Sequence, residues 1–362
     1  MFKINKITKI AIYITILSLF LSSCINKQSD SKNVLYVYNW GLYIDEEVIN
    51  IFEKETGIKV VYDMFDTNEE MYTKVKSGNI IYDCACPSDY MIERMAAEEL
   101  LYSYNLSDLE YYNNLDTKIL ELSKSFDYNN TYAVPYVYST IGISYNKTLL
   151  DEKNLPYPKS WSDLWNEQYD GEIMMQDAVR DLLMVGLKKN NYSLNTKNIN
   201  EINKACNDLI NQKDLSVSYV IDEVRDLMVS GSKSIGVTYS GEMEYMRTSN
   251  QEYEYSYVIP SEGTNMTIDS WVIFKNAKNV DAAKKWINFL LREDISKMNY
   301  EYMHYGSPNI KVMEDLRKQE LDDESIFPKL DDANLKKYEI YKYLGGDIED
   351  IYLDSWKKIH NS

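Results

Sequence analysis

Aromatic residues follow the carboxyl ends of several predicted strands in this chain of 362 residues. The turn Asn-Trp-Gly-Leu-Tyr at 39–43 places Trp40 and Tyr43 after an apolar strand, and Tyr90 and Tyr239 come at the ends of two further strands. In open α/β sheets a ligand sits beyond the carboxyl ends of the strands, so large rings at this edge are candidates for a binding wall. The alternative for Trp40 is packing alone, as a plug of the junction between helix and strand.

Three aspartates are candidates to accompany these rings. Asp269 lies inside the extended run 267–273, where an acid is disfavoured, so a turn, a pocket or a binding role must offset its cost. Asp177 and Asp181 lie four residues apart at the entry to a predicted helix. If the helix includes both, their carboxylates share a face and repel unless a cation joins them. The alternative is that Asp177 caps the helix and Asp181 complements its N-terminal dipole.

A ligand with ammonium ends and an apolar middle would match this combination of residues. Carboxylates neutralise its charges, while aromatic faces pack against its methylenes and contribute cation–π attraction of roughly 0.5 to 2 kcal/mol per contact. The combination favours binding over catalysis, because no nucleophile is visibly paired with a base. The chain contains only two histidines, His304 and His360, so it has too few to make a histidine-rich metal site and few to serve in a catalytic triad. We therefore expect a binding protein that is not an enzyme and uses no cofactor or metal.

The elements that must position these residues predict an α/β protein. The segment 34–62 is predicted as strand, helix and strand, with Asp45 as the helix N-cap and Gly57 as its stop. The other predicted helices are 68–77, 179–189, 199–211, 222–229 and 280–291, and the other predicted strands are 82–86, 133–145, 171–175, 234–239 and 266–274. Asn68 is the predicted cap of the first of these helices, and Asp89 that of a further helix beginning beside it.

The first residues predict export. Three lysines precede the apolar run 10–21, which is too short for a comfortable membrane span and has the flanks of a secretory signal. It ends in Leu-Ser-Ser-Cys at 21–24, which resembles the cleavage site of bacterial lipoproteins. The resemblance implies that residues 1–23 are a signal peptide, that Cys24 is lipidated and that residues 24–33 form a tether. The alternative is an ordinary export signal with a chance cysteine. We expect a protein anchored by lipid at the periplasmic or extracellular face of a membrane.

The rest of the chain is long and acidic. Its length exceeds what one core usually accommodates, which predicts two lobes. Removing the three lysines of the export segment leaves 36 Lys and Arg against 57 Asp and Glu, a net charge of −21, which should repel nucleic acid and attract cations. Cys84 and Cys86 alternate along a predicted strand and are expected, with Cys206, to pack in the core. A disulfide between such near neighbours would be strained, and three thiols supply too few ligands for a metal.

Motifs along nearly the whole mature chain resemble the polyamine-binding proteins of ABC importers. They include Leu-Tyr-Val-Tyr-Asn-Trp at 35–40, Pro-Ser-Asp-Tyr at 87–90, Asp-Ala-Val-Arg-Asp at 177–181 and Ile-Asp-Ser-Trp at 268–271. The resemblance implies a type II periplasmic-binding-protein-like fold, in which two α/β lobes are joined by two crossing segments and close on a ligand cleft like a hinged clamp. Lobe 1 would comprise residues 34–138 and 268–313, and lobe 2 residues 139–267 and 314–362.

The same resemblance implies a binding site and partners. In that family, positions matching Asp181 and Asp269 bind ammonium groups, and Asp177 matches an acid beside them. The other implied ligand-binding positions are Trp40, Gly41, Tyr43, Ser88, Tyr90, Tyr239, Thr267, Tyr305 and Tyr341. The implied partners are putrescine or spermidine, the permease subunits of an ABC transporter and, through the lipid anchor, a membrane. We expect a monomer that binds no nucleic acid.

Several positions depart from the family pattern and bear on specificity. Leu42 and Ala178 stand where family members place acids, and Thr267 where an aromatic ring often stacks on the ligand. Tyr239 replaces a tryptophan, and Tyr341 stands where an amide reaches in. Fewer acids satisfy fewer ammonium groups, so the diamine putrescine is at least as well suited as the triamine spermidine. The alternatives are a protein of the same fold for ferric iron or a sugar, or an exported hydrolase.

Overall fold

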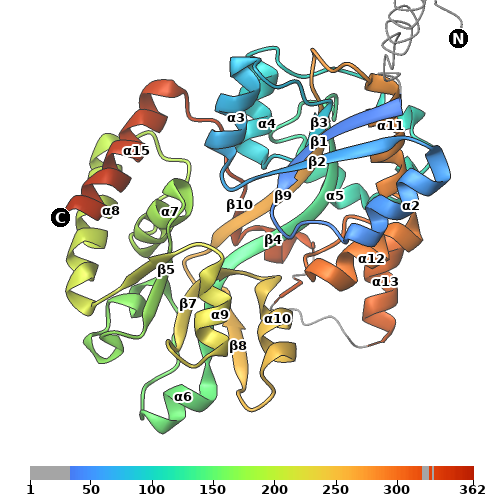
Figure 1. Ribbon diagram of the computed structural model, residues 1–362. Coiled ribbons are helices and arrows are strands. Elements are labelled where there is room, and N and C mark those ends of the chain that lie inside the picture. The colour runs from blue at the N-terminus through green and yellow to red at the C-terminus, as the bar shows by residue number, and fades with distance from the viewer. Residues whose placement is uncertain (1–32, 320–325, 328–329) are drawn as a thin grey trace, which may run out of the picture.

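The structure is a computed structural model that describes residues 33–319, 326–327 and 330–362 (Figure 1). The predicted signal peptide, the lipidation site Cys24 and nearly all of the tether lie outside these residues. Among the helices of the described ranges, none is long and apolar enough to cross a membrane.

The chain opens with a strand, a helix and a second strand, as predicted. These are β1 (Val34–Trp40), α2 (Glu46–Thr56) and β2 (Lys59–Phe65). The Asp45 carboxylate accepts the backbone N–H of Glu47 and so caps the helix. Gly57 ends the helix with a φ of 69°, a left-handed conformation that glycine adopts without strain.

One continuous sheet path runs through both lobes in the order β2-β1-β3-β9-β4-β7-β5-β6, with β10 beside β9 and β8 beside β4. The further strands are β3 (Cys84–Ala85), β4 (Ala133–Asn146), β5 (Ile173–Gln176), β6 (Ser218–Val220), β7 (Ile235–Tyr239), β8 (Tyr255–Val258), β9 (Thr264–Ile273) and β10 (Tyr338–Glu339). The mixture of parallel and antiparallel strands with helices confirms the predicted α/β class.

Two long antiparallel strands, β4 and β9, pass between the lobes (Figure 1). The first part of β4 pairs with β9, from Ala133 opposite Val272 to Thr140 opposite Met266. From Ile141 onward β4 pairs instead with β7 and β8. The change of partners lies close to the predicted lobe boundary at 138 and 139. The two-lobe fold therefore agrees with the prediction, and the exact boundaries stay a prediction.

Helices cover the sheet on both sides. They are α3 (Asn68–Ser77), α4 (Asp89–Ala97), α5 (Thr117–Ser123), α6 (Lys147–Glu152), α7 (Val179–Lys189), α8 (Ile199–Gln212), α9 (Glu223–Val229), α10 (Glu242–Ser249), α11 (Val280–Leu290), α12 (Glu293–Met303), α13 (Ile310–Lys318), α14 (Asp332–Leu335) and α15 (Gly346–Asn361). Figure 1 shows α7, α8 and α15 together at one side of the molecule. Two predicted caps are wrong: Thr67, not Asn68, caps α3, and Ser88 precedes α4, whose first residue is Asp89.

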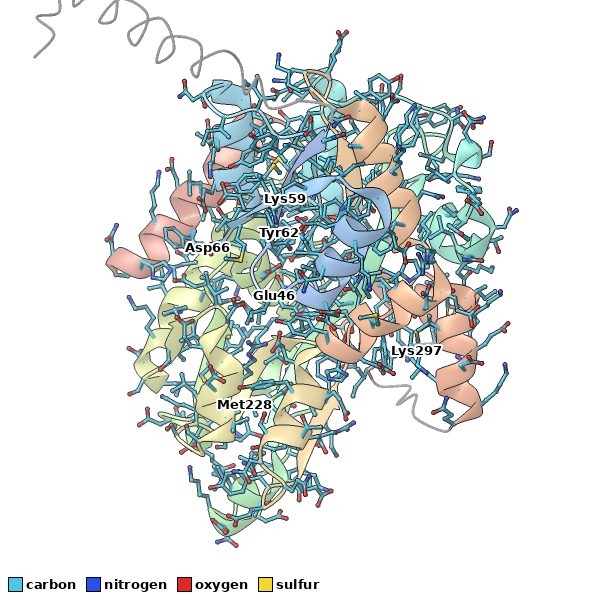
Figure 2. The ribbon with its side chains drawn as sticks, turned by 45° about the vertical axis from the view of Figure 1, so that its right-hand side comes forward. Glu46, Lys59, Tyr62, Asp66, Met228 and Lys297 are labelled. Atoms are coloured by element: carbon cyan, nitrogen blue, oxygen red, sulfur yellow. The ribbon has the colours of Figure 1, made fainter. Side chains whose placement is uncertain are left out.

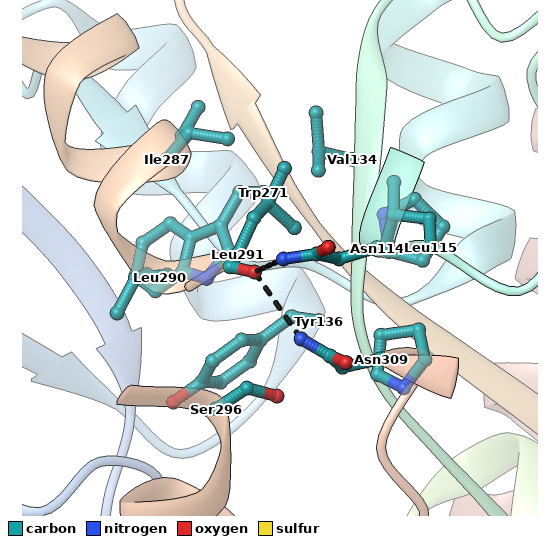
Figure 3. Close-up of a pocket in the computed structure, with 12 residues that line it drawn as sticks. Asn114, Leu115, Val134, Tyr136, Trp271, Ile287, Leu290, Leu291, Ser296 and Asn309 are labelled. Carbon is teal, nitrogen blue, oxygen red and sulfur yellow. Dashed lines mark hydrogen bonds between the residues drawn. The ribbon is translucent and has the colours of Figure 1, made fainter. Parts of the chain in front are cut away.

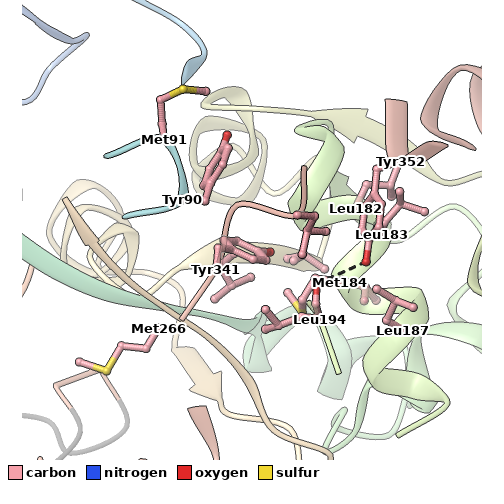
Figure 4. Close-up of a cluster of buried hydrophobic side chains, with 14 of the residues drawn as sticks. Tyr90, Met91, Leu182, Leu183, Met184, Leu187, Leu194, Met266, Tyr341 and Tyr352 are labelled. Atoms are coloured by element: carbon pink, nitrogen blue, oxygen red, sulfur yellow. Dashed lines mark hydrogen bonds between the residues drawn. The ribbon is translucent and has the colours of Figure 1, made fainter. Parts of the chain in front are cut away.

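The core confirms the expectation for the cysteines and joins α4 to α7. Cys84, Cys86 and Cys206 are buried and free. In the cluster of Figure 4, Tyr341 lies between Tyr90 of α4 and the apolar residues of α7. The segment around Tyr341, near the end of the chain, thus packs between α4 and α7.

Charged side chains of both signs cover the exterior. Lys59 pairs with Glu53 at 2.9 Å, and Lys297 of α12 lies 3.8 Å from Glu301 (Figure 2). Such exposed pairs contribute little to stability, about 0 to 1 kcal/mol each. The acidic excess is therefore distributed over a solvated surface.

Candidate functional site

Asp269 projects from the crossing strand β9 and is only 5% exposed. Its Oδ2 accepts the Tyr43 hydroxyl at 2.5 Å, and its Oδ1 accepts the Thr267 hydroxyl at 3.2 Å. Burial raises the pKa of Asp269, although hydrogen bonds from Tyr43, Ser88 and Thr267 counteract part of the shift. A buried carboxylate held only by hydroxyl groups is prepared to receive a cation.

Asp181 lies in the first turn of α7, in the other lobe, and is also 5% exposed. Its Oδ2 accepts the Tyr239 hydroxyl at 2.5 Å and its Oδ1 accepts the Tyr341 hydroxyl at 2.9 Å. Burial raises the pKa of Asp181, while the two tyrosine hydrogen bonds and the charge of Arg180 act in the opposite direction. The two aspartates thus have closely similar surroundings.

The aromatic turn supplies rings next to Asp269. Tyr43 lies 5.5 Å from Tyr305 between ring centroids, and Trp40 meets Tyr43 edge-on at 6.4 Å. The Trp40 indole also packs on Phe65 at 4.5 Å and donates its N–H to the Cys86 carbonyl at 2.9 Å. Trp40 therefore does fill the junction behind the turn, while its ring remains partly exposed beside Tyr43.

Tyr90 supplies a ring on the Asp181 side. It meets Tyr341 edge-on at 6.1 Å between centroids and is 8% exposed. Its hydroxyl donates to Glu69 at 2.9 Å and accepts from the Asn68 amide at 3.2 Å. Asn68 also accepts the backbone N–H of Ser88 at 3.1 Å, so α3 fixes both predicted residues at the start of α4.

The two aspartate surroundings adjoin each other. Burial raises the pKa of Tyr239 well above its usual range, and the neighbouring charges of Asp181, Tyr341 and Tyr305 add to the shift. Tyr305 belongs to the Asp269 side, where its ring lies 5.5 Å from Tyr43, and a Cβ on Gly241, two residues after Tyr239, would lie 2.8 Å from the same ring, so the two groups of rings adjoin. The structure therefore unites two buried carboxylates and five tyrosines from distant parts of the chain.

Glu242 is a third buried acid at this site, which our sequence analysis did not single out. It begins α10 and is 9% exposed. Its Oε1 accepts the Tyr305 hydroxyl at 2.9 Å, and its Oε2 accepts Arg225 Nη1 at 3.2 Å. The Tyr305 ring packs so closely on Gly241 that a Cβ there would lie 2.8 Å from it. The signal in the sequence that could have indicated Glu242 is its position directly after Gly241, just beyond the strand that ends in Tyr239.

Asp177 lies apart from this group, and one predicted helix feature is wrong. It precedes α7, whose N-cap is Ala178, so Asp177 and Asp181 do not share a helix face and Asp177 does not cap the helix. Its carboxylate instead accepts the Trp356 indole N–H at 3.1 Å and lies 2.7 Å from His360 Nε2. The side chain is held by the C-terminal helix α15.

Gly41 and Leu42 complete the aromatic turn without joining the rings. Nothing lies within 4 Å of the position that a Cβ would take on Gly41. Leu42 is 57% exposed and has a φ of 52°. No hydrogen bond given for the described residues joins either side chain to the two aspartates, and the predicted role of Gly41 stays a prediction.

A small pocket is lined by Tyr136 and Trp271, and Tyr136 lies 6.2 Å from Tyr43 between ring centroids (Figure 3). Asn114 and Asn309 both donate to the Leu291 carbonyl at its rim, at 2.9 and 3.2 Å. No acid lines this pocket, and within the described ranges no group of three or more His, Cys, Asp or Glu side chains could hold a metal.

The chain is similar to known bacterial proteins in sequence and in structure. The family model for bacterial extracellular solute-binding protein matches residues 47–328. The chain is 32% identical over 332 residues to the spermidine/putrescine-binding periplasmic protein of Escherichia coli (strain K12), covering 91% of this chain and 92% of that protein. Among solved structures, a Listeria monocytogenes protein superimposes with a TM-score of 0.82 at 38% identity, over 91% of this chain and 99% of that chain. The spermidine/putrescine ABC transporter substrate-binding protein PotD from Streptococcus pneumoniae gives a TM-score of 0.77 at 36% identity, with the same coverage.

Proposed function

Because this chain belongs to the bacterial extracellular solute-binding proteins, we propose that it captures polyamines outside the cytoplasmic membrane and delivers them to an ABC permease. The observation that supports this role best is the pair Asp181 and Asp269. Each carboxylate is buried, and in the described part of the chain neither forms an ion pair. Burying a carboxylate without an ion pair costs several kcal/mol. The nearby charge of Arg180 offsets part of this cost at Asp181, and a ligand with two ammonium groups would offset the cost at both acids.

The hydrogen bonds at each aspartate limit what it can accept. A carboxylate offers about four lone-pair positions. Hydroxyl groups already use two positions on Asp181 and two on Asp269. Each acid therefore keeps free lone-pair positions for an ammonium group. A polyamine would place one ammonium at each end and its methylenes against the tyrosine rings.

The geometry disfavours a ferric iron site of the same fold. Such a site needs tyrosine oxygens that converge on one point. Here the hydroxyls of Tyr43, Tyr239 and Tyr305 each donate to a different carboxylate. The relatives are solute-binding components of transporters, and we propose no catalytic role for this chain.

Ligand specificity follows from the acids that are missing. Leu42 is exposed and Ala178 only caps α7, so neither supplies a charge where family members place one. We therefore propose that putrescine binds at least as tightly as spermidine. Calorimetric titration measures both affinities, and a clear preference for spermidine would contradict this part of the proposal.

Closure and anchoring complete the proposed function. In the free protein the two carboxylates repel each other across the lobes, and a polyamine neutralises them and favours closure about β4 and β9. The proposed lobes are residues 34–138 with 268–313, and 139–267 with 314–362. Lipidation at Cys24 would hold the protein on the membrane, and a Cys24→Ala variant should be released into the soluble fraction.

Thermal-shift screening tests the proposed ligand class. Putrescine, spermidine, cadaverine, agmatine and arginine are compared with butylamine, which has the same carbon chain as putrescine but one amine less. A ligand at 100 times its Kd stabilises the native state by about 2.7 kcal/mol, enough to raise Tm clearly. We expect shifts with the polyamines and none with butylamine. Equal shifts with butylamine, or none with any polyamine, would refute the proposal.

A further inference from the structure

We propose that Glu242 and Arg225 set the selectivity for polyamine length: Arg225 acts as an internal cation that occupies a third acid of the site, which an additional ammonium group would otherwise use. This role presupposes the polyamine function proposed above. It makes Arg225 a specificity-determining residue that touches no ligand, and Glu242 the group through which it acts.

Glu242 lies at the wall of the site. Glu242 comes three residues after Tyr239, the last residue of β7, and its Oε1 is 2.9 Å from the hydroxyl of Tyr305. The Tyr305 ring in turn lies 5.5 Å from Tyr43, which donates to Asp269. An ammonium group packed on the face of Tyr305 would therefore lie within range of the Glu242 charge.

Arg225 on α9 neutralises that charge from the opposite side. Its Nη1 donates to Glu242 Oε2 at 3.2 Å, and the two side chains are only 19% and 11% exposed. The guanidinium packs over the Tyr245 ring at 4.4 Å, which fixes its position. Burial lowers the pKa of Arg225, but the carboxylates of Glu242, Asp222 and Asp226 raise it by more, so the cation persists.

The three buried acids therefore differ in what they offer to a ligand. Asp181 and Asp269 accept only hydroxyl groups, whereas Glu242 already holds a cation. Asp89 also lies near the site, but its carboxylate accepts the backbone N–H groups of Tyr90 and Ile268 and so serves the fold. A diamine finds a partner for each charge, and a triamine has one charge left over.

The test compares the Kd values of putrescine and spermidine by calorimetry in the full-length mature protein. In Arg225→Met the Glu242 carboxylate loses its cation, so spermidine should gain at least fivefold relative to putrescine. The double variant Arg225→Met/Glu242→Gln should return the ratio to within twofold of the wild type. Arg225→Lys, which keeps the charge, should also leave the ratio unchanged.

Arg292→Met is the matched control. Arg292 pairs with Glu55 at 2.6 Å and is 24% exposed, so its loss changes the net charge equally but away from the site. An unchanged ratio in Arg225→Met, or an equal change in Arg292→Met, would overturn the role of Arg225. If Arg225→Met does not fold, Glu242→Gln carries the test, because the unpaired Arg225 cation should weaken spermidine more than putrescine. A wild type that binds neither amine would instead refute the polyamine function itself.

Discussion

Replacing Asp269 with asparagine should separate ligand affinity from protein stability. The carboxylate is 5% exposed and would make a charge-assisted hydrogen bond to an ammonium group. Hydrogen bonds to charged groups contribute about 1.5 to 3 kcal/mol, and loss of the buried counter-charge adds to this. We expect a total of about 2 to 4 kcal/mol, which corresponds to a Kd that rises roughly 30- to 1,000-fold.

The free protein should respond in the opposite direction. Burial raises the pKa of Asp269, which means that its charged form is costly in the folded state without ligand. Asparagine has nearly the same shape: its carbonyl oxygen can still accept the Tyr43 hydroxyl, and its amide N–H can donate to the Thr267 hydroxyl oxygen, which turns that hydrogen bond around. The Tm of the free variant should therefore equal or exceed that of the wild type. A variant that had merely misfolded would lose both affinity and Tm.

Calorimetric titration with putrescine and scanning calorimetry of the free protein measure the two quantities. Asp177→Asn is the matched control, because that acid is held by Trp356 and His360 and lies apart from the site. Its affinity should stay within about twofold of the wild type, although its Tm can fall. Unchanged putrescine affinity in Asp269→Asn would refute the assignment of this carboxylate, as would an equal loss in Asp177→Asn.

Three further predictions follow from the same contacts. Because burial raises the pKa of Asp181 and Asp269, the folded state binds their protons at higher pH than the unfolded chain does. Acidification from neutral pH toward their usual pKa of about 3.9 should therefore stabilise the free protein and weaken polyamine binding. The double variant Asp181→Asn/Asp269→Asn should lose the pH dependence of both Tm and Kd. Gly241→Ala should weaken polyamine binding at least fivefold, because its Cβ would lie 2.8 Å from the Tyr305 ring, whereas Gly346→Ala, with nothing within 4 Å, should leave the calorimetric Kd unchanged. Gly142→Ala should lower the unfolding free energy by about 1 to 3 kcal/mol in denaturant titration, because its Cβ would lie 2.4 Å from Tyr257; a loss below 0.5 kcal/mol would show that this contact relaxes.

Local patterns in the sequence predicted most of the elements. The apolar spacing and end residues of α7 and α2 gave bounds that agree with the structure, since these signals act within one turn, whereas the second opening strand extends to Phe65, three residues beyond its predicted end. The cap of α3 was assigned one residue too late, because Thr67 and Asn68 are both good capping residues and only the backbone decides between them.

The contacts at the site that the sequence did not show involve partners far away in the sequence. The sequence grouped Asp177 with Asp181, whereas its carboxylate contacts Trp356 and His360 of the C-terminal helix, about 180 residues later. The Glu242 and Arg225 pair was missed because the two residues come from different helices, and no local pattern shows that they meet. Tertiary packing determines the contacts of Asp177 and of the Glu242 and Arg225 pair, and the residue types alone do not show which distant side chains meet.

The position of β9 determines the order in which this chain can fold. In the sheet, β9 lies between β3 and β4, although it follows both by well over 100 residues in the sequence. Until residues 264–273 arrive, β3 and β4 have no common neighbour, and their backbone groups on that side lack partners. The first lobe cannot complete its sheet before the second lobe's strands have been made. We therefore expect the lobes to refold as one slow cooperative unit, and a fragment that ends before β9 to aggregate when expressed alone.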